Sequence, residues 1–490
     1  MKPHISPAIK ARLVRGAFCL LLLLSVCAIP FALAQRTKTK GNQPANVITV
    51  TNTNDSGPGS LRQALADAND GDTINFTAWP GTIGLTSGEL LVARSITIAG
   101  PGAENLVVNG NAKNRVFHVT GGNVTISGLT IINGSASGIL LGGGIYNDHS
   151  TLTVNNCTIN DNVANEGGGI CNDGSANGTA TLQINNSNFS GNLGGQGAAI
   201  LNYAPYVGYA AAQINSSSMT GNGGYGISII VCLENVCGQA SVQVNSCTLS
   251  ANNGGIFADL RSDLAISNST LSGNGVALTN YDKVSTTSIS NCTLNESSVD
   301  IFNQGSVTIS NTVLKVDPSG HTIVNVGSVD SLGYNLSSDD GGGYLTGPGD
   351  QINTDPILGP LQDNGGPTFT HALLPGSPAL NAGDPNFTPP PFFDQRGSGF
   401  DRVRNGRLDV GSYEEQALLN TPTPTSTPTA TATASTTPTA TATATPTATL
   451  TPCPGCSRTP HPRPTPAPRP LPSAPPSPHA TPRFTPVPRP

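Results

Sequence analysis

A repeat of short strands in the middle of the 490-residue chain limits its fold more than any other feature. A six-residue alternation of apolar and polar residues returns every 20 to 30 residues, and a glycine-rich alternation falls between its copies. The copies start at Ile126, Val154, Ile184, Ile214, Val244, Ile266, Ile289 and Ile309. Such short alternations indicate strands with one inward face, and this period without helix-length segments is typical of a β-solenoid. We therefore predict an all-β chain with a parallel β-helix over residues 73–335, of about ten to twelve coils.

The third position of each copy predicts a sharp corner. It is occupied by Asn, Ser or Gly, and Asn in particular tolerates the left-handed backbone that a corner requires. The predicted corners are Asn156, Asn186, Ser216, Ser246, Asn268, Asn291 and Asn311. We expect stacked Asn side chains at these corners to hydrogen-bond from coil to coil. The next position is Cys157, Cys247 or Cys292 in three coils, and we expect these cysteines to pack in the core.

The two ends of the chain differ from the repeat in composition. Residues 1–34 join a basic start to an apolar stretch that closes with the A-x-A sequence at Ala32, which predicts a secretory signal peptide. An uncleaved membrane anchor and a lipoprotein acylated at Cys27 are the alternatives. No later stretch approaches the ~20 apolar residues of a membrane span, so we predict no transmembrane helix in the mature chain. Residues 416–490 are rich in Thr, Pro and Ala and predict a disordered stalk or tail.

Residues 35–72 are predicted to form an N-terminal capping segment. Ser60 is a helix N-cap residue and Gly71 a helix stop. One face of the short helix between them is formed by Leu61, Ala64, Leu65 and Ala68. An open solenoid end exposes core and unpaired backbone, and a short amphipathic helix covers both.

The charge of the body excludes one class of partner. Residues 35–415 hold 14 of the 23 Lys and Arg and all 29 Asp and Glu, a net charge of −15. Nucleic acid binding depends on cations that displace counterions, so we predict no nucleic acid partner. The same charge repels polyanionic sugars unless a metal bridges them. We expect an exported monomer, secreted or held at the cell surface.

Several motifs resemble a known group of exported proteins. TVTNTNDS from Thr49, GSLRQAL from Gly59 and GGGIYN from Gly142 are similar to right-handed parallel β-helix proteins of the pectin lyase-like type with an N-terminal CSLREA motif. Residues 336–415 resemble the choice-of-anchor Q domain through DNGGPT from Asp363 and LDVGSYE from Leu408, with HALLPGSPALNAG and DQRG between them. The resemblance implies a right-handed helix and an exported surface protein, without an agreed biochemical activity.

One pair of acids recurs at matching positions of adjacent coils, which catalysis or metal binding on a solenoid requires. Asp148 and Asp173 each follow a strand of the glycine-rich alternation, 25 residues apart, with His149 and Glu166 near in sequence. We expect two solvated turn aspartates at these positions. The alternative is a site that binds Ca²⁺ or positions a sugar, since adjacent coils lie about 4.8 Å apart. Asp148 and Asp173 are the candidate catalytic and metal-binding residues, and Ca²⁺ is the candidate cofactor.

Two functions remain open on the sequence. The first is a non-catalytic exported rod for surface structure or adhesion, which the near absence of Lys and Arg from residues 116–260 favours. The alternative is an extracellular protein that binds or degrades polysaccharide, with lyase or hydrolase chemistry. Aromatic faces suit sugar rings, and the candidate ligand-binding residues are Tyr146, Tyr203, Tyr206, Tyr209 and Tyr225.

Four cysteines outside the signal peptide and the predicted core positions lie in closely spaced pairs. Cys232 and Cys237 flank a short loop and are spaced to pair, whereas Cys453 and Cys456 form a CxxC sequence without a supporting fold context. The sequence leaves open whether each pair is a disulfide or two thiols.

Overall fold

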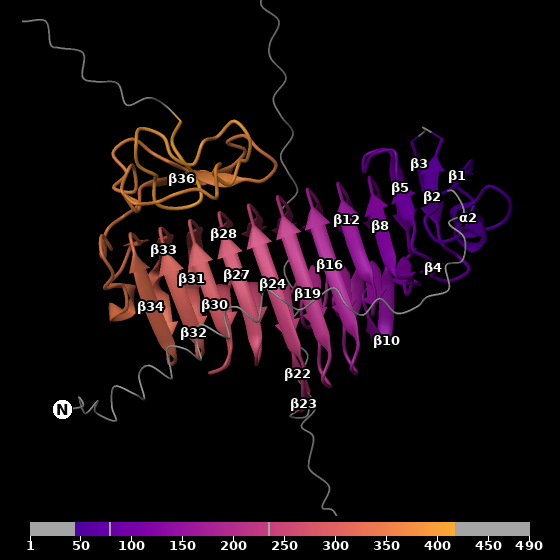
Figure 1. Cartoon of the computed structure of the whole chain (residues 1–490), viewed down its shortest axis with the longest axis horizontal. Helices are drawn as coiled ribbons and strands as arrows, with labels where there is room; N and C mark the ends of the chain where they lie inside the picture. The colour runs from indigo at the N-terminus through magenta and orange to yellow at the C-terminus, as the bar shows by residue number, and fades with distance from the viewer. Residues whose placement is uncertain (1–44, 78–79, 234–235, 417–490) are drawn as a thin grey trace, which may run out of the picture. The chain divides into compact units, whose positions relative to one another are not determined.

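The computed structural model describes residues 45–77, 80–233 and 236–416, and within these ranges the chain is a parallel β-solenoid (Figure 1). The predicted signal peptide, all but the first residue of the predicted tail, and Cys453 and Cys456 lie outside the described residues. The all-β prediction is confirmed, since helix is limited to α2 (Leu61–Asp67) and one 3₁₀ turn, Gly341–Gly343, in the described chain. No described helix is long and apolar enough to cross a membrane.

Twelve parallel strands form one long face, here called sheet A, which Figure 1 shows side by side along the rod. They correspond to about eleven turns, within the predicted number, whereas the right-handed winding stays a prediction. In order the strands are β1 (Val47–Val50), β2 (Thr73–Phe76), β5 (Thr97–Ala99), β8 (Asn123–Ser127), β12 (Thr151–Asn155), β16 (Thr179–Asn185), β19 (Tyr209–Asn215), β24 (Gln239–Asn245), β27 (Ser262–Ser267), β30 (Thr286–Ser290), β32 (Ser306–Ser310) and β34 (Ser328–Gly333). The first strand therefore lies inside the segment predicted as a cap.

A second sheet completes each coil as two strips, called strip B and strip C. Strip B contains β3 (Gly81–Gly84), β6 (Leu106–Asn109), β9 (Thr130–Ile132), β13 (Thr158–Asn160), β17 (Asn188–Ser190), β20 (Ser218–Thr220), β25 (Thr248–Ser250), β28 (Thr270–Ser272) and β35 (Leu336–Ser337). Strip C contains β4 (Leu90–Val92), β7 (Phe117–Val119), β11 (Ile145–Asp148), β15 (Ile170–Asp173), β18 (Ile200–Tyr203), β21 (Tyr225–Ile230), β26 (Gly254–Ala258) and β29 (Val276–Asn280). The long strands β31 (Thr293–Asn303) and β33 (Val313–Asn325) take part in both strips.

Two short strand pairs lie outside the coils. β10 (Ser135–Leu141) pairs with β14 (Val163–Glu166) in the loops between strips B and C. β22 (Cys232–Leu233) and β23 (Val236–Cys237) form an antiparallel pair closed by a disulfide between Cys232 and Cys237, the bonded one of the two alternatives that the sequence left open.

The core is one continuous stack of inward apolar side chains. In a single coil Leu152 and Val154 of β12, Ile159 of β13 and Ile170 of β15 are fully buried, and their counterparts in the other coils are buried in the same way. Alternation of inward apolar and outward polar residues produces this stack, because successive side chains of a strand point to opposite faces. The predicted core cysteines are confirmed as buried free thiols at Cys157, Cys247 and Cys292, together with Cys171 on β15.

All seven predicted corner residues have a left-handed backbone, with φ between 48° and 55°. The prediction that their side chains form the coil-to-coil ladder is wrong for most of them. Among the described residues, one side-chain hydrogen bond joins two of these corners, from Asn268 Nδ2 to Ser246 Oγ at 3.3 Å. The corner backbone N–H of Asn156 instead donates to the carbonyl of Asn185 in the next coil, so the left-handed turn alone explains the choice of Asn.

The amide ladder lies at the next corner and inside the solenoid. Five fully or almost fully buried side chains form it through four bonds of 2.9–3.1 Å, each from Nδ2 to Oδ1 of the following coil: Asn162, Asn192, Asn222 and Asn252 donate, and Asn274 is the last acceptor. Each donor also bonds a backbone carbonyl of the preceding coil or its own coil, such as Ile159 for Asn192. Buried amides satisfied in this way stabilise the stack, because an unpaired buried amide costs several kcal/mol in hydrocarbon-like surroundings.

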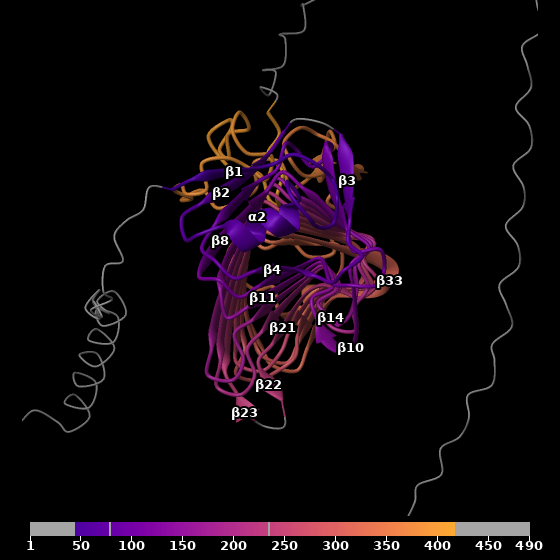
Figure 2. The same cartoon turned by 90° about the vertical axis from the view of Figure 1, so that its right-hand side faces the viewer.

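Helix α2 covers the N-terminal end of the solenoid, as predicted (Figure 2). Ser60 caps it through a 3.2 Å bond from the backbone N–H of Gln63, and Leu61 and Leu65 are buried in the core. The helix ends at Asp67, with Ala68 as its C-cap, and so stops four residues before Gly71.

After β35, the chain up to residue 415 forms loops, the 3₁₀ turn and one antiparallel pair, β36 (Leu358–Gln362) and β37 (Thr370–Leu373); we call this part the C-terminal module. Buried polar side chains bond it to the solenoid: Gln395 contacts Thr248 at 2.9 Å and Thr270 at 2.6 Å, and the backbone N–H of Ser412 donates to Thr293 at 3.0 Å. The module therefore belongs to the same compact unit as the coils.

Candidate functional site

The two candidate acids lie at matching positions of adjacent coils. Asp148 ends β11 and Asp173 ends β15, and the two residues are direct partners in the parallel pairing. Both aspartate side chains point outward from strip C, because neighbouring residues of a strand point to opposite faces. Asn147 and Asn172, which precede them, point inward and bond each other at 2.6 Å. The predicted stack is therefore present, but Asp173 is only 4% exposed, so it is not a solvated turn aspartate.

Asp148 lies between two histidines. Its Oδ2 contacts Nε2 of His118 at 3.1 Å, and its Oδ1 contacts Nδ1 of His149. The second nitrogen of His149 donates to the carbonyl of Ser175 at 2.8 Å. His118 lies on β7, one coil before Asp148, so a contact between coils fixes its imidazole.

Glu89 and Arg115 extend this group toward the N-terminal end. Glu89 Oε1 contacts Nδ1 of His118 at 3.0 Å, and Glu89 Oε2 accepts from Nη1 of Arg115 at 2.7 Å. Arg115 is almost buried and also donates to the carbonyls of Leu141 and Gly142. Glu89, Arg115 and His118 were not predicted from the sequence, and only the pairing of β7 with β11 in the structure places His118 beside Tyr146.

Tyr146 joins this group to the second acid. Its hydroxyl donates to Oδ2 of Asp173 at 2.7 Å, while Oδ1 of Asp173 accepts from the backbone N–H of Ser175 at 2.8 Å. The Tyr146 ring centre lies 5.0 Å from the His118 ring and 4.7 Å from the guanidinium carbon of Arg115. We call these seven side chains the strip C cluster: Glu89, Arg115, His118, Tyr146, Asp148, His149 and Asp173.

The cluster shifts the protonation of its members. The hydrogen bond with Glu89 raises the pKa of His118 against the effect of burial, and the bond with Asp148 adds to the increase. Burial acts to raise the pKa of Asp148, but the bonds from His149 and His118 outweigh it and lower that pKa. His118 is thereby favoured as an imidazolium between two carboxylates, which makes it a proton donor.

Burial raises two further pKa values, one of a cluster member and one of a neighbouring residue. Burial and the bond to Asp173 raise the pKa of the Tyr146 phenol, so its proton stays on the oxygen. Burial also raises the pKa of Glu166, which lies on β14 beside strip C.

The predicted calcium site has no open carboxylate oxygen in this arrangement. All four oxygens of Asp148 and Asp173 accept hydrogen bonds from the protein. No group of three or more His, Cys, Asp or Glu in the described ranges is arranged to hold a metal ion. The two acids alone thus do not fit a cation that takes six to eight oxygen ligands. A calcium site here remains a prediction, and no chemistry is derived from it.

Aromatic side chains continue along the outer face of strip C beyond the cluster. Tyr225 on β21 lies 5.3 Å from Phe257 on β26, and Phe257 lies 5.9 Å from Tyr281 in the following coil. Tyr225 pairs in register with Gly254, where any side chain would collide with the tyrosine ring. We call Tyr225, Phe257 and Tyr281 the aromatic row.

The structure divides the candidate tyrosines between two places. Tyr146, Tyr203 and Tyr225 lie on strip C strands, and Tyr203 packs with the outer apolar group of Cys171, Leu201 and Ile230. Tyr206 lies in the turn before sheet A, and Tyr209 begins β19 of sheet A. Strip C therefore gathers three of the five, and sequence spacing alone did not separate them from the other two.

Comparison with known proteins supports the fold. No family model and no curated protein matches the chain. The structure is similar to the pectate lyase Pel9A, with a TM-score of 0.52 and 15% identity over 77% of this chain and 98% of that chain. XylC in complex with xylose gives a TM-score of 0.42 at 10% identity over 65% of this chain and 88% of that one. A rhamnogalacturonan lyase gives 0.35 at 11% identity over 68% and 96%.

The chain thus has the parallel β-helix fold that the pectate lyase Pel9A also has. Identity at this level shows the fold alone. The resemblance of residues 47–72 to CSLREA-type proteins and of residues 336–415 to the choice-of-anchor Q domain stays a prediction.

Proposed function

We propose that this chain is an exported β-helix protein that binds a neutral extracellular polysaccharide along the outer face of strip C. The observation that carries the proposal is that the strip C cluster and the aromatic row lie on the same outer face, on either side of the β18 coil, whose outward Leu201 is buried. An extended polymer fits a face that repeats with the coil spacing of about 4.8 Å.

The two parts of the face offer complementary contacts to a sugar chain. The aromatic row presents flat apolar rings, of which Tyr281 is 51% exposed. The cluster presents hydroxyl, imidazole and carboxylate groups that donate to and accept from sugar hydroxyls. Binding sites of this kind combine apolar walls with a few polar groups that fix orientation.

The charge of the body favours a neutral chain. The fold shared with a pectate lyase supports polysaccharide as the class of ligand. The net charge of −15 over residues 35–415 opposes a polyanion, and Arg115, the one cation of the cluster besides its histidines, is already paired with Glu89.

Cleavage of the bound chain is a step that the cluster supports only in part. His118 is favoured as an imidazolium and its side chain is 21% exposed, but both of its N–H groups are bonded to Glu89 and Asp148, so one of these bonds has to break before it protonates a leaving glycosidic oxygen. Hydrolysis also needs a base or nucleophile, and both oxygens of Asp148 and of Asp173 already accept hydrogen bonds. Binding is therefore the primary proposal.

The place of action follows from the two ends of the chain. The signal peptide predicted for residues 1–34 would export the protein, and the tail predicted for residues 416–490 would extend it from its folded body. A secreted or cell-surface monomer is the form that we propose.

A non-catalytic rod remains the second candidate. The observation that favours it is the mutual pairing inside the cluster, where Glu89, His118 and Asp148 use their polar atoms on one another. A network of this kind stabilises adjacent coils without any ligand.

The experiment uses the purified exported chain and a panel of cellulose, xylan, mannan, β-1,3-glucan and polygalacturonate. Affinity electrophoresis measures binding, and reducing ends and unsaturated products measure cleavage. We expect at least one neutral polysaccharide to be bound, with affinity reduced at least tenfold in the double variant Tyr225→Ala/Tyr281→Ala. Tyr209→Ala, an exposed tyrosine of sheet A, is the matched control. Binding that the double variant leaves unchanged would contradict the proposal, and absence of all binding would favour the rod.

A further inference from the structure

A groove of about 640 Å³ lies between the outer face of sheet A and the segment 390–397 of the C-terminal module. Its floor is made of outward side chains of β19, β24, β27 and β30, and its wall is formed by Pro390, Pro391, Phe392 and Phe393. The strip C face lies on different strands, so this groove is a separate surface of the solenoid.

The floor is a regular array of amides and hydroxyls. Gln213 and Gln243 occupy the same position of successive coils, and Nε2 of the first donates to Oε1 of the second at 3.1 Å. Two residues further along the same strand as Gln243, Oδ1 of Asn245 accepts from Oγ of Ser267 in the next coil at 3.2 Å. Among the described residues, no side chain accepts from Nε2 of Gln243, so this amide retains donors for a ligand.

The wall presents an aromatic ring on a fixed backbone. The Phe392 side chain is 66% exposed, although the phenylalanine backbone is anchored on both sides. Its carbonyl accepts from the backbone N–H of Arg402 at 2.9 Å, and the carbonyl of Phe393 accepts from Nδ2 of Asn268 at 3.1 Å. A large apolar ring held rigidly in solvent marks a binding surface, because exposing it costs stability without a folding benefit.

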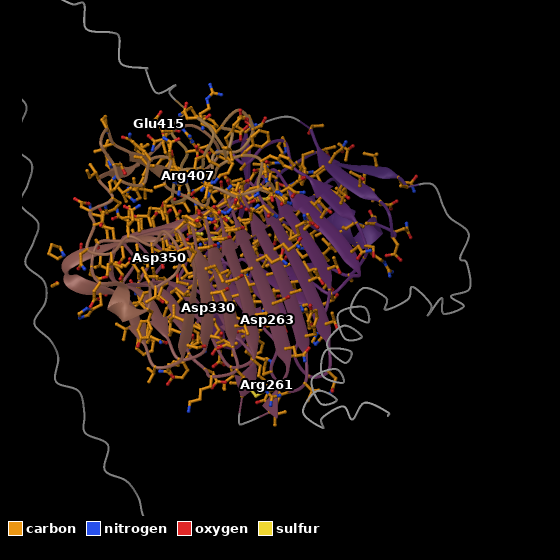
Figure 3. The ribbon with its side chains drawn as sticks, turned by 60° about the vertical axis from the view of Figure 1, so that its left-hand side comes forward. Arg261, Asp263, Asp330, Asp350, Arg407 and Glu415 are labelled. Carbon is orange, nitrogen blue, oxygen red and sulfur yellow. A yellow bond between two sulfur atoms is a disulfide. The ribbon has the colours of Figure 1, made fainter. Side chains whose placement is uncertain are left out.

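The charge of the lining restricts the ligand. Among the described residues that line the groove, one is charged, namely Asp394. Its side chain is 1% exposed and forms an ion pair with Arg396 at 2.5 Å. A smaller hollow of about 310 Å³ continues along sheet A past Gln243 to Asp263 and Thr308. Figure 3 shows Asp263 on the sheet, well away from Arg407 and Glu415 of the module.

We propose that this groove is a second carbohydrate site, which binds a neutral oligosaccharide. One sugar ring stacks on Phe392. The side-chain amides of Gln213 and Gln243, and those of Asn215 and Asn245, hydrogen-bond the hydroxyls of successive sugar units. Uncharged donors and acceptors repeated at the coil spacing, next to one exposed ring, match a neutral sugar chain better than a peptide or a charged polymer. The inference rests on the proposed function only for the class of ligand, because the groove and the strip C face share no residues.

Isothermal titration of the full chain with cellohexaose, xylohexaose, mannohexaose and hexagalacturonate tests the groove. We expect at least one neutral hexasaccharide to bind and hexagalacturonate to give no heat. Phe392→Ala should weaken that binding at least tenfold, and Gln243→Ala about three- to tenfold. Both side chains are exposed, so folding should be unaffected, which circular dichroism and the unfolding midpoint check. Phe369→Ala, an exposed phenylalanine outside the groove lining, is the matched control.

The outcomes separate the two sites. Binding lost in Phe392→Ala but kept in Tyr225→Ala/Tyr281→Ala supports the groove, whatever the fate of the strip C proposal. Binding kept in Phe392→Ala and lost in the double variant overturns the groove and leaves the proposed function standing. If no neutral hexasaccharide binds the wild-type chain, the groove proposal fails.

Discussion

His118 and Asp148, thirty residues apart in sequence, contact each other at 3.1 Å across two coils of strip C, and His118 contacts Glu89 on its other side at 3.0 Å. One imidazole thus links two carboxylates from different coils. The stability of this link depends on pH, because the contact favours a protonated ring and ionised acids.

His118→Ala should destabilise the chain by about 1–2 kcal/mol near pH 6. The raised pKa of His118 contributes stability that is present below its unfolded value of about 6.5 and is lost as pH rises through the folded value. The lowered pKa values of Glu89 and Asp148 contribute stability that is lost as pH falls through their folded values. The difference between wild type and variant should therefore shrink toward pH 9 and below about pH 4.

Urea midpoints of His118→Ala at several pH values measure this dependence. His321→Ala, an exposed histidine of β33, is the control and should show no such profile. An equal loss of stability at pH 6 and pH 9 would mean that His118 acts through packing rather than charge.

The inner amide ladder should be more sensitive than any corner. Asn192→Ala removes two bonds that its Nδ2 donates and two that its Oδ1 accepts, and the buried backbone N–H of Asn162 loses its acceptor. We expect a loss of roughly 3 kcal/mol or more in the free energy of unfolding. Asn188→Ala, an exposed residue of the same coil, should cost less than about 0.5 kcal/mol. Similar midpoints for both variants would show that the ladder does not stabilise the stack.

The corner at Asn156 tests backbone strain alone. Its φ is 52°, which a β-branched residue resists, so Asn156→Val should cost about 1–3 kcal/mol. Asn156→Gly keeps the conformation accessible and should stay within about 1 kcal/mol of wild type. Denaturant midpoints compare the two, and a valine variant as stable as the glycine variant would contradict a strained corner.

The regular coils were predictable, because the spacing of the repeat fixes the register of the strands. Asp148 and Asp173 lie 25 residues apart at equal phase, and the structure pairs them directly. The ladder was also visible in principle, since Asn162, Asn192 and Asn222 recur every 30 residues. The ladder was predicted at the corner asparagines instead, because a left-handed turn and an inward-pointing amide both favour Asn and the sequence does not distinguish them.

The rest of the cluster was not predictable in the same way. Glu89, Arg115 and His118 come from the early coils, where loops of unequal length hide the period. Their contacts depend on which side chains of β4 and β7 point outward and on how far Arg115 reaches, and these follow from folding in three dimensions. The groove wall joins Phe393 to Asn268, 125 residues away, a contact that local patterning does not indicate.

The core cysteines should be unreactive in the folded chain. Burial raises the pKa of Cys157 to about 11 and that of Cys247 and Cys292 to about 12, so little thiolate forms near neutral pH. In a Cys453→Ser/Cys456→Ser chain, a thiol reagent should label none of the four described free cysteines before denaturation and all four after it. Rapid labelling of one thiol under native conditions would locate an opening of the stack at that coil.

Calcium gives the sharpest test of the acid pair. The structure assigns both oxygens of Asp148 to histidines and both oxygens of Asp173 to Tyr146 and Ser175, so a shared cation would have to displace hydrogen bonds that already satisfy these carboxylates. We therefore expect the melting temperature near pH 7 to be the same with millimolar Ca²⁺ as with a chelator. Asp148→Asn should lower it equally in both, because the variant weakens the contacts of His118 and His149. A ligand that binds only the folded state stabilises it by mass action. A Ca²⁺-dependent rise that Asp148→Asn abolishes, and that His321→Ala does not, would show that the pair rearranges around a cation and that its hydrogen bonds are the resting form of a metal site.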